Sequence, residues 1–428
     1  MQVKTLLNRV HPVKGFVYQS PRLIEDASQP NGAYIEVELR PRKGSRGTCS
    51  SCGRRGPAYD KREVRRFAFV PLWNLAVDLL YTPRRIDCRH CGVKIERLPW
   101  LAPASKSPMT LAMVVFLATW ARRLSWQQVA GVFNVSWDSV YAAVQAVVEY
   151  GLAHRSLQGI TAIGVDEVAY RKGHRYLTLV YQLNEGCRRL LYVVEGRSVR
   201  SLLGFFHMLK REGRRIEQDL IGSIRFVCSD MWQAYLKVIR KKLPHALHIL
   251  DRYHIVANLN KALDQVRAAE ARQLAKEGWD VLKHTRWLLL RRRKRLTGKQ
   301  RWRLRELLQW NLRTVRAYIL AESLQALWAY RSPSHAGRFL DAWCRDVMRS
   351  RLEPLKTVAR SLRSHRELIL NWFRAKKQFN SGIVEGLNAL VKLRFRKAFG
   401  FRTYHAMEVA LYHELGDLPE PELTHTFC

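Results

Sequence analysis

Three acidic residues stand where a chain can bring carboxylates together for chemistry. Asp166 ends one predicted strand, Asp230 ends another, and Glu385 lies in the first turn of a predicted helix. Converging carboxylates supply the hard oxygen ligands that Mg²⁺ and Mn²⁺ prefer, and such ions assist reactions at phosphorus. Each acid alone also has an ordinary explanation, because aspartates often end strands and Glu385 would interact favourably with the helix dipole.

The cysteines offer a second, softer set of ligands. Four of the eight form two C-x-x-C pairs: Cys49 with Cys52, and Cys88 with Cys91. Four thiolates suit tetrahedral zinc, and strand-like runs at 64–70 and 75–81 predict a finger with an inserted hairpin. Two unrelated reduced pairs are the alternative, and His90 could replace a cysteine as ligand. The remaining cysteines are scattered, which favours a reducing, cytoplasmic compartment over a disulfide framework.

The charge balance indicates a polyanionic partner. The chain has 74 Lys+Arg against 36 Asp+Glu, a formal net charge of +38. Such an excess destabilises a folded chain by self-repulsion unless a polyanion binds it, and nucleic acid is the first candidate. A membrane surface is a weaker one. The longest nearly apolar run, 111–121, is too short to span a bilayer, and residues 1–10 show no secretory signal.

The apolar spacing between residues 108 and 152 predicts helices. A helix over 109–122 precedes two further helices, which Ser125 and Ser136 should cap and which a short turn joins. This pattern describes a helix-turn-helix, whose last helix enters a major groove, although an ordinary helical hairpin fits it too. The residues at the reading end of that helix would be Trp137, Asp138, Ser139 and Tyr141.

From residue 159 the sequence predicts three strands, a helix, a strand, a helix and a strand, the element order of an RNase H-like sheet. In that topology the first and fourth strands are neighbours, so Asp166 and Asp230 would emerge side by side. Glu167 should point to the opposite face, because side chains alternate along a strand. Asp251 and His254 form a D-x-x-H pair after the fifth strand. They are expected near the site, although Asp251 could simply cap the next helix.

Residues 255–375 are predicted to be helical and basic. Between His284 and Arg316 there are 12 Lys+Arg against one acid, interleaved with three tryptophans. One-signed charge with flat aromatic rings suits a phosphate backbone and unpaired bases, while a solvated helix face is the alternative. The expected DNA contacts in the densest run are Arg291, Arg292, Arg293, Lys294 and Arg295. Those expected elsewhere are Arg84, Arg85, Lys392, Arg394, Arg396 and Arg402.

In this order the motifs resemble the bacterial insertion-sequence transposases of the ISL-three family over nearly the whole chain. The match is weaker from about 310 to 370. The stretches that carry it are the knuckles around Cys49 and Cys88, Ile163-Gly-Val-Asp166-Glu167, Arg171-Lys-Gly-His174-Arg175-Tyr176, Cys228-Ser-Asp230-Met231 with Tyr235, Asp251-Arg-Tyr-His254-Ile-Val256, and Asn380-Ser-Gly-Ile-Val-Glu385-Gly-Leu-Asn388 continuing into Arg396-Lys-Ala-Phe-Gly-Phe-Arg402.

The resemblance implies that Asp166, Asp230 and Glu385 form the acid triad of DDE recombinases. It implies two Mg²⁺ (or Mn²⁺) ions per active site, about 4 Å apart, beside one structural Zn²⁺ on the cysteines. The implied activity is cleavage and joining of the element's inverted-repeat ends. The implied partners are double-stranded DNA, both element ends and target, and a second copy of the chain in a homodimer or higher assembly, with no membrane.

We therefore expect a multidomain α+β protein whose RNase H-like α/β catalytic core is interrupted by an all-helical insertion. The expected segments are a zinc-binding domain over 1–104, a helix-turn-helix over 105–155, the first part of the core over 156–258, the basic helical insertion over 259–375, and the C-terminal core helices over 376–428. A structure-selective nuclease would share the triad. A zinc and helix-turn-helix transcriptional regulator would explain only the first two segments.

Overall fold

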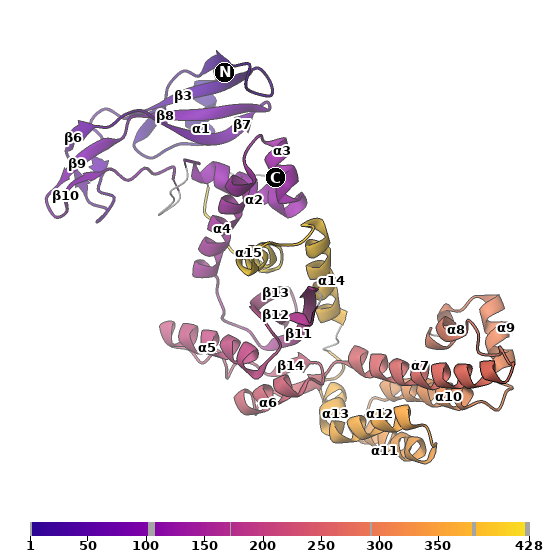
Figure 1. Ribbon diagram of the computed structural model, residues 1–428. Coiled ribbons are helices and arrows are strands. Elements are labelled where there is room, and N and C mark those ends of the chain that lie inside the picture. The colour runs from indigo at the N-terminus through magenta and orange to yellow at the C-terminus, as the bar shows by residue number, and fades with distance from the viewer. Residues whose placement is uncertain (1, 102–107, 172, 292, 379–381, 424–428) are drawn as a thin grey trace. The chain divides into compact units, whose positions relative to one another are not determined.

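The computed structural model describes residues 2–101, 108–171, 173–291, 293–378 and 382–423 (Figure 1). The chain forms two compact units: residues 1–156 together with 393–428 make up unit 1, and residues 157–392 make up unit 2. One helix, α14 (Gly382–Lys397), begins in unit 2 and ends in unit 1. Within the described ranges, no helix has the length and apolar character needed to cross a membrane.

Unit 1 begins with two separate β modules. The larger is a five-stranded sheet in the order β1-β3-β8-β7, with β2 paired to β3. Its elements are α1 (Val3–Val10), β1 (Phe16–Tyr18), β2 (Arg22–Glu25), β3 (Ala33–Pro41), β7 (Arg65–Leu72) and β8 (Leu75–Tyr81). Alternate residues such as Val37, Phe67 and Leu79 are fully buried in one core.

The smaller module holds the cysteines. It consists of a three-stranded sheet in the order β10-β9-β6 and a two-stranded ladder of β4 with β5. Its strands are β4 (Gly47–Thr48), β5 (Arg55–Gly56), β6 (Ala58–Lys61), β9 (Arg84–Cys88) and β10 (Gly92–Ile95). The predicted hairpin between the cysteine pairs exists as β7 and β8. It joins the larger sheet rather than the finger, because β8 pairs with β3 and shares its core.

Helices complete unit 1. They are α2 (Leu111–Arg123), α3 (Trp126–Val132), α4 (Trp137–His154) and α15 (Tyr404–Leu415). Ser125 and Ser136 accept the predicted capping bonds from the backbone N–H groups of Gln128 and Ser139. Residues 376–428 were expected to belong to the catalytic core, whereas 393–428 belong to unit 1. The reason is that α15 packs on α4.

Unit 2 is built on a five-stranded sheet in the order β13-β12-β11-β14-β15. The first three strands form an antiparallel meander, and β14 and β15 run parallel to β11. The elements are β11 (Ala162–Arg171), β12 (Arg175–Asn184), β13 (Cys187–Glu195), α5 (Val199–Arg215), β14 (Phe226–Ser229), α6 (Gln233–Lys242) and β15 (Leu247–Leu250). Ile163 and Val165 pack with α5 and α6 in a core that covers one face. The predicted element order and the predicted neighbouring strands are both present.

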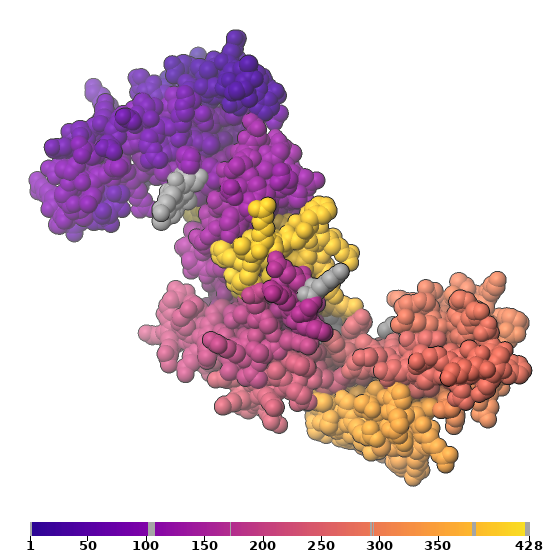
Figure 2. Space-filling view, in the orientation of Figure 1, coloured from indigo at the N-terminus to yellow at the C-terminus, as the bar shows by residue number. Residues whose placement is uncertain are grey.

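The rest of unit 2 is helical, as predicted. Its helices are α7 (Arg252–Lys276), α8 (Arg286–Leu290), α9 (Gly298–Leu307), α10 (Arg313–Leu324), α11 (Pro333–Arg349), α12 (Glu353–Ser364) and α13 (Arg366–Arg374). With 25 residues, α7 extends about 37 Å. Helices α8 and α9 lie alongside its far part (Figure 1), in the salmon-coloured lobe of Figure 2. The Glu270 carboxylate accepts the first backbone N–H bonds of α10. The chain then returns to the sheet, where Asn371 of α13 donates to the carbonyl of His248.

Candidate active site and metal sites

Two aspartates lie side by side where the parallel pairing of β11 with β14 ends. Val165 pairs with Ser229, so Asp166 and Asp230 are the next residues along their strands. The sequence suggested that Asp166 ends its strand. It does not, because β11 continues to Arg171 along β12. It is therefore the end of the shorter strand, β14, that places the two carboxylates together.

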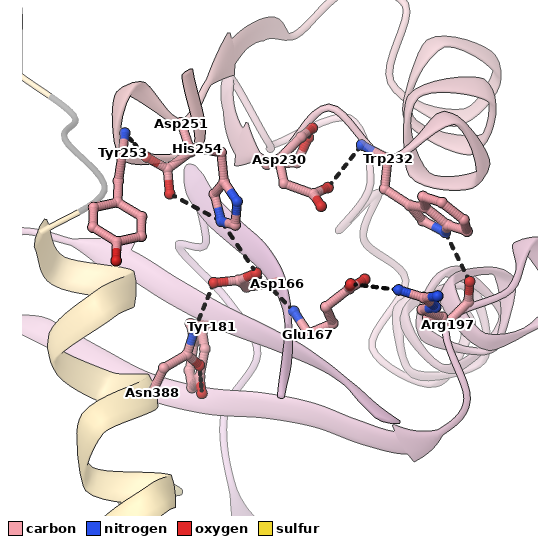
Figure 3. Close-up of polar contacts among 11 residues, drawn as sticks. Asp166, Glu167, Tyr181, Arg197, Asp230, Trp232, Asp251, Tyr253, His254 and Asn388 are labelled. Carbon is pink, nitrogen blue, oxygen red and sulfur yellow. Dashed lines mark hydrogen bonds and ion pairs between the residues drawn. The ribbon is translucent and has the colours of Figure 1, made fainter. Parts of the chain in front are cut away.

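Asp166 is buried and held by two hydrogen bonds (Figure 3). Its Oδ1 accepts from the backbone N–H of Glu167 at 2.8 Å, and its Oδ2 accepts from Nδ2 of Asn388 at 2.6 Å. The hydroxyl of Tyr181 donates to Oδ1 of Asn388 at 2.8 Å and so fixes the amide. Burial raises the pKa of Asp166 above its ordinary value. The sequence motif contained Asn388 but did not reveal this role.

Asp230 lies just beyond β14 in the loop to α6. Its Oδ1 accepts from the backbone N–H of Trp232 at 3.0 Å. Burial raises the pKa of Asp230 to about 6, and the negative charges of Glu167 and Asp166 act in the same direction. The charges of these strand ends therefore already repel one another in the protein without a bound cation.

The sequence left two interpretations open for Asp251 and His254, a helix cap and a place near the site, and both are correct. Asp251 caps α7, since its Oδ1 accepts from the backbone N–H of Tyr253 at 2.6 Å. His254 also lies at the aspartate site, with Nε2 3.9 Å from Oδ1 of Asp166 and 3.7 Å from Oδ2 of Asp251. The pair thus combines a structural cap with a place beside the carboxylates (Figure 3).

Glu385 lies in the first turn of α14, between two contacts with β11. On one side Val384 packs so closely on Gly164 that a Cβ there would lie 2.7 Å from Cγ2 of Val384. On the other side Asn388 bonds Asp166. Residues three apart are neighbours on a helix surface, so Glu385 lies one turn from the Asp166 contact, with its side chain exposed. Asn380 and Ser381 of the same motif lie outside the described residues.

Among the described residues, the basic group beside the aspartates is His254, and no lysine or arginine pairs with them. In a chain with 74 Lys+Arg, none of those described forms an ion pair with Asp166, Asp230 or Asp251. Buried carboxylates are ordinarily paired with a cation, and their oxygens are suitable ligands for Mg²⁺ or Mn²⁺. Their oxygens do not form a single closed shell, but two ions about 4 Å apart would not require one. The donor set thus fits divalent cations supplied from solution.

The four cysteines form the second site. Their four Sγ atoms all lie within 4.8 Å of one another, close enough for one metal ion to be bound by all four. The backbone N–H of Cys52 is the main reason that the pKa of Cys49 is lowered to about 6, which favours the thiolate. His90 instead has its Nε2 against Arg54. The cluster could therefore hold a metal ion through its cysteines alone.

The start of α4 presents an aromatic stack. The rings of Trp137 and Tyr141 are stacked at 5.5 Å, and each lies 5.6 Å from the ring of Trp126. Trp137 is 39% exposed, whereas Tyr141 and Ser139 are half-buried. Of the residues predicted to read DNA from this helix, Trp137 and Asp138 are thus the exposed ones, and the Tyr141 ring supports the position of Trp137.

Two arginines expected to contact DNA are used inside unit 1. Arg84 lies 2.7 Å from Oε2 of the buried Glu96. Arg394 is 4% exposed, donates to the carbonyl of Ala121 at 3.3 Å and lies 3.6 Å from Glu414. Neither guanidinium is available to a phosphate, contrary to the expectation from the sequence.

The other basic candidates remain accessible. Lys392, Arg396 and Arg402 are exposed, and Arg85 keeps a third of its side chain exposed beside Asp60. In the insertion, Arg291, Arg293 and Arg295 are exposed, Arg292 lies outside the described residues, and the Lys294 side chain is also outside them. Residues 293–295 form a 3₁₀ turn, so this run is not the face of an α-helix.

Comparison with known proteins gives consistent results. A family model described as "Transposase" matches residues 163–411, a stretch that contains all three candidate acids. The chain is 31% identical over 375 residues to the transposase for insertion sequence element IS1001 of Bordetella parapertussis, covering 87% of this chain and 89% of that protein. It is 26% identical over 408 residues to the transposase for insertion sequence element IS1557 of Mycobacterium tuberculosis, covering 90% and 89%.

Proposed function

This chain belongs to the ISL-three family of DDE transposases, and on that premise we propose that it binds the inverted-repeat ends of its own insertion sequence and catalyses strand cleavage and strand transfer there. Asp166, Asp230 and Glu385 are the proposed catalytic residues of an RNase H-like core. The observation that carries the proposal is the pair of neighbouring aspartates, one buried and one half-buried, that lack a lysine or arginine partner among the described residues.

The carboxylates would hold two Mg²⁺ or Mn²⁺ ions. When bound, such ions activate the attacking oxygen and stabilise negative charge on the leaving oxygen. The protein's own residues set the geometry. The Glu167 N–H and the Asn388 amide orient Asp166, and the Trp232 N–H orients Asp230. Nε2 of His254, within 4 Å of two carboxylates, limits their mutual repulsion whenever it is protonated.

Recognition and non-specific affinity belong to different parts of the chain in this proposal. The cysteine cluster holds one zinc and, with the helix-turn-helix, recognises the element ends through Trp137, Ser139 and Tyr141. Exposed arginines and lysines of the insertion and of α14 contact phosphates of end and target DNA, a sequence-independent contribution. Because two ends must be joined, a homodimer is the minimum active assembly.

The test is cleavage and joining of labelled element ends in Mg²⁺. Asp166→Asn, Asp230→Asn and Glu385→Gln should each abolish both reactions and leave end binding in a gel-shift assay largely unchanged. Glu185→Gln, an exposed acid in the β12–β13 turn, is the matched control. Near-normal cleavage by one of the three variants would remove that residue from the triad. Cleavage without joining by the wild type would favour the nuclease alternative.

A further inference from the structure

The turn between β13 and α5 carries an arginine that is held on several sides. The guanidinium of Arg197 lies 4.0 Å from the ring centroid of Tyr176 and 4.7 Å from that of Trp232. Its Nη1 lies 3.1 Å from Oε1 of Glu167 and donates to it. Stacking between two rings with an ion pair at the edge fixes the plane of the group, a geometry that lysine cannot reproduce.

The backbone on both sides of this side chain is also fixed. Gly196 has φ +90°, a conformation that favours glycine, and its N–H donates to the Tyr176 carbonyl at 2.7 Å. The hydroxyl of Thr178 donates to the Gly196 carbonyl at 2.6 Å, and Nε1 of Trp232 donates to the Arg197 carbonyl at 2.9 Å. Arg197 is therefore a rigid part of the turn and not a mobile surface cation.

The contacts of Arg197 lead to both strand-end aspartates (Figure 3). On one side, Glu167 directly follows Asp166 and donates its N–H to that carboxylate. On the other side, the Trp232 N–H donates to Asp230. The register of β11 with β14 ends one residue earlier, at Val165 and Ser229, so the ladder does not hold the aspartates together. The arginine connects the two strand ends where the ladder has stopped.

Arg197 also compensates a charge beside the site. Glu167 points to the face opposite Asp166, as strand alternation predicted, and there Arg197 is its ion-pair partner. Its Oε2 is buried and has no hydrogen-bond partner among the described residues. Removing the arginine would leave the half-buried Glu167 carboxylate, which directly follows Asp166, without its ion-pair partner, and this favours movement of the strand end.

We propose that Arg197 is a positioning residue: it clamps together the strand ends that carry Asp166 and Asp230. This inference rests on the proposed metal-dependent function, because the purpose of the clamp is to hold the two carboxylates at a separation that a pair of divalent ions can bridge. Residues that orient metal ligands typically change metal affinity about 10- to 100-fold when they are substituted.

The test measures Mn²⁺ binding to the zinc-loaded full-length protein without DNA, by calorimetry. Arg197→Gln should raise the Mn²⁺ Kd about tenfold or more, and Arg197→Lys should raise it less, because it keeps the charge but loses the stacking. Arg200→Gln, an exposed arginine three residues further on, is the matched control and should leave the Kd unchanged. End binding in gel-shift assays should be equal for the two Gln variants.

Three outcomes would overturn the clamp. If Arg197→Gln binds Mn²⁺ like the wild type while Asp166→Asn loses binding, the clamp is wrong and the proposed metal site stands. If Arg197→Gln weakens only DNA binding, the arginine is a DNA contact. If the wild type itself binds no Mn²⁺, the proposed site fails and the clamp with it.

If Arg197→Gln does not fold, Trp232→Phe is the substitute variant. It keeps an aromatic ring beside Arg197 but removes the hydrogen bond from Nε1 to the Arg197 carbonyl, and it should weaken Mn²⁺ binding several-fold.

Discussion

At the residue scale, the site places negative charges where burial opposes them. Asp166 and Asp230 have raised pKa values for the same first reason, desolvation by the surrounding protein. A cation that enters the site relieves both the burial cost and the mutual repulsion, so metal binding and deprotonation are linked. The chain thus stores an unfavourable charge arrangement that a divalent ion would convert into a favourable one.

We expect Mn²⁺ binding by the DNA-free protein to strengthen as pH rises from 5 to 7. Burial raises the pKa of Asp230 to about 6, so below pH 6 a proton occupies the carboxylate that the cation requires. If one proton is displaced, the apparent Kd should fall about tenfold per pH unit below 6 and level off above it. Calorimetric titrations at several pH values measure this. A Kd independent of pH would contradict it.

The stability of the metal-free protein should respond in the opposite sense. The folded state holds the Asp230 proton more tightly than the unfolded chain, whose pKa is 3.8, so this stabilisation is present below pH 4 and lost as pH rises through 6. Asp230→Asn should therefore raise the unfolding free energy at pH 7.5 by on the order of 2 kcal/mol and change it little at pH 4. Urea denaturation with a chelator at both pH values measures the difference, and equal effects would refute it.

Two arginines on the same helix should behave oppositely when substituted. Arg394 is buried against Ala121 and Glu414, so Arg394→Gln should lower the unfolding free energy by about 3 kcal/mol and leave the folded protein's DNA affinity unchanged. Arg396 is exposed, so Arg396→Gln should keep stability and weaken DNA binding. Urea denaturation and gel shifts on both variants decide. The reverse result would mean that Arg394 leaves its buried site to bind DNA.

At the element scale, the two β modules of unit 1 differ in what holds them together. The five-stranded sheet has a core of its own, which includes Phe67 and Leu79. The buried core of the cysteine module, within the described residues, contains only Cys49, Ile86 and Cys88, with Cys91 packed against it. So small a core cannot offset the entropy of ordering the strands, and a bound metal would supply the missing stabilisation.

We expect one zinc per chain, bound by the four cysteines, and local unfolding without it. Cys88→Ser should lose the zinc and make the segments 47–61 and 84–96 sensitive to limited proteolysis, while the larger sheet, which includes β7 and β8 between them, stays folded. Cys187→Ser, in β13, is the matched control and should retain the metal. Metal analysis together with proteolysis measures both effects. Full zinc content in Cys88→Ser would show that the metal lies elsewhere.

At the scale of the whole molecule, the dominant feature is a positive charge far larger than a fold requires. The insertion places an exposed basic run and four exposed tryptophans about the far end of α7: Trp279, Trp287, Trp302 and Trp310. A charge of +38 provides affinity for any DNA, and that affinity depends on salt because bound counterions are released. Under the proposed function, specific end recognition comes from unit 1 and not from this charge.

Replacing residues 291–295 with glutamine should weaken binding to all duplexes alike. The slope of log affinity against log salt should flatten by roughly 0.9 for each phosphate that the variant no longer neutralises, and preference for the element end should survive. Salt titrations on element-end and random duplexes measure both quantities. The matched control should leave the slope nearly unchanged. It replaces five exposed basic residues of α5 with glutamine: Arg200, Lys210, Arg211, Arg214 and Arg215.

Two results would contradict this division of labour. Identical slopes for the wild type and the 291–295 variant would mean that the run is only a solvated surface. Loss of preference for the element end, with random DNA bound as before, would mean that recognition lies in the insertion and not in unit 1.

The sequence alone predicted those features that depend on short stretches of chain. The C-x-x-C spacing predicted which cysteines pair, and the capping serines marked the starts of α3 and α4. The alternation of apolar residues identified strands and predicted that Glu167 points to the face opposite Asp166. The element order of unit 2 also predicted that Asp166 and Asp230 would be neighbours, since it specifies which strands pair. These properties follow from local periodicity and from the small number of topologies that such an order allows.

Only the tertiary structure decided what each side chain is used for. Whether Arg394 contacts DNA or supports α2 depends on Ala121, far away in the sequence, and exposure is a property of packing rather than of composition. The same holds for Arg197, whose partners come from β11, β12 and the loop after β14. Asp166 lies at the site because the pairing of β11 with β14 ends just before it, and no residue of β11 itself marks that position. Where the pairing ends is decided by hydrogen bonds between the two strands.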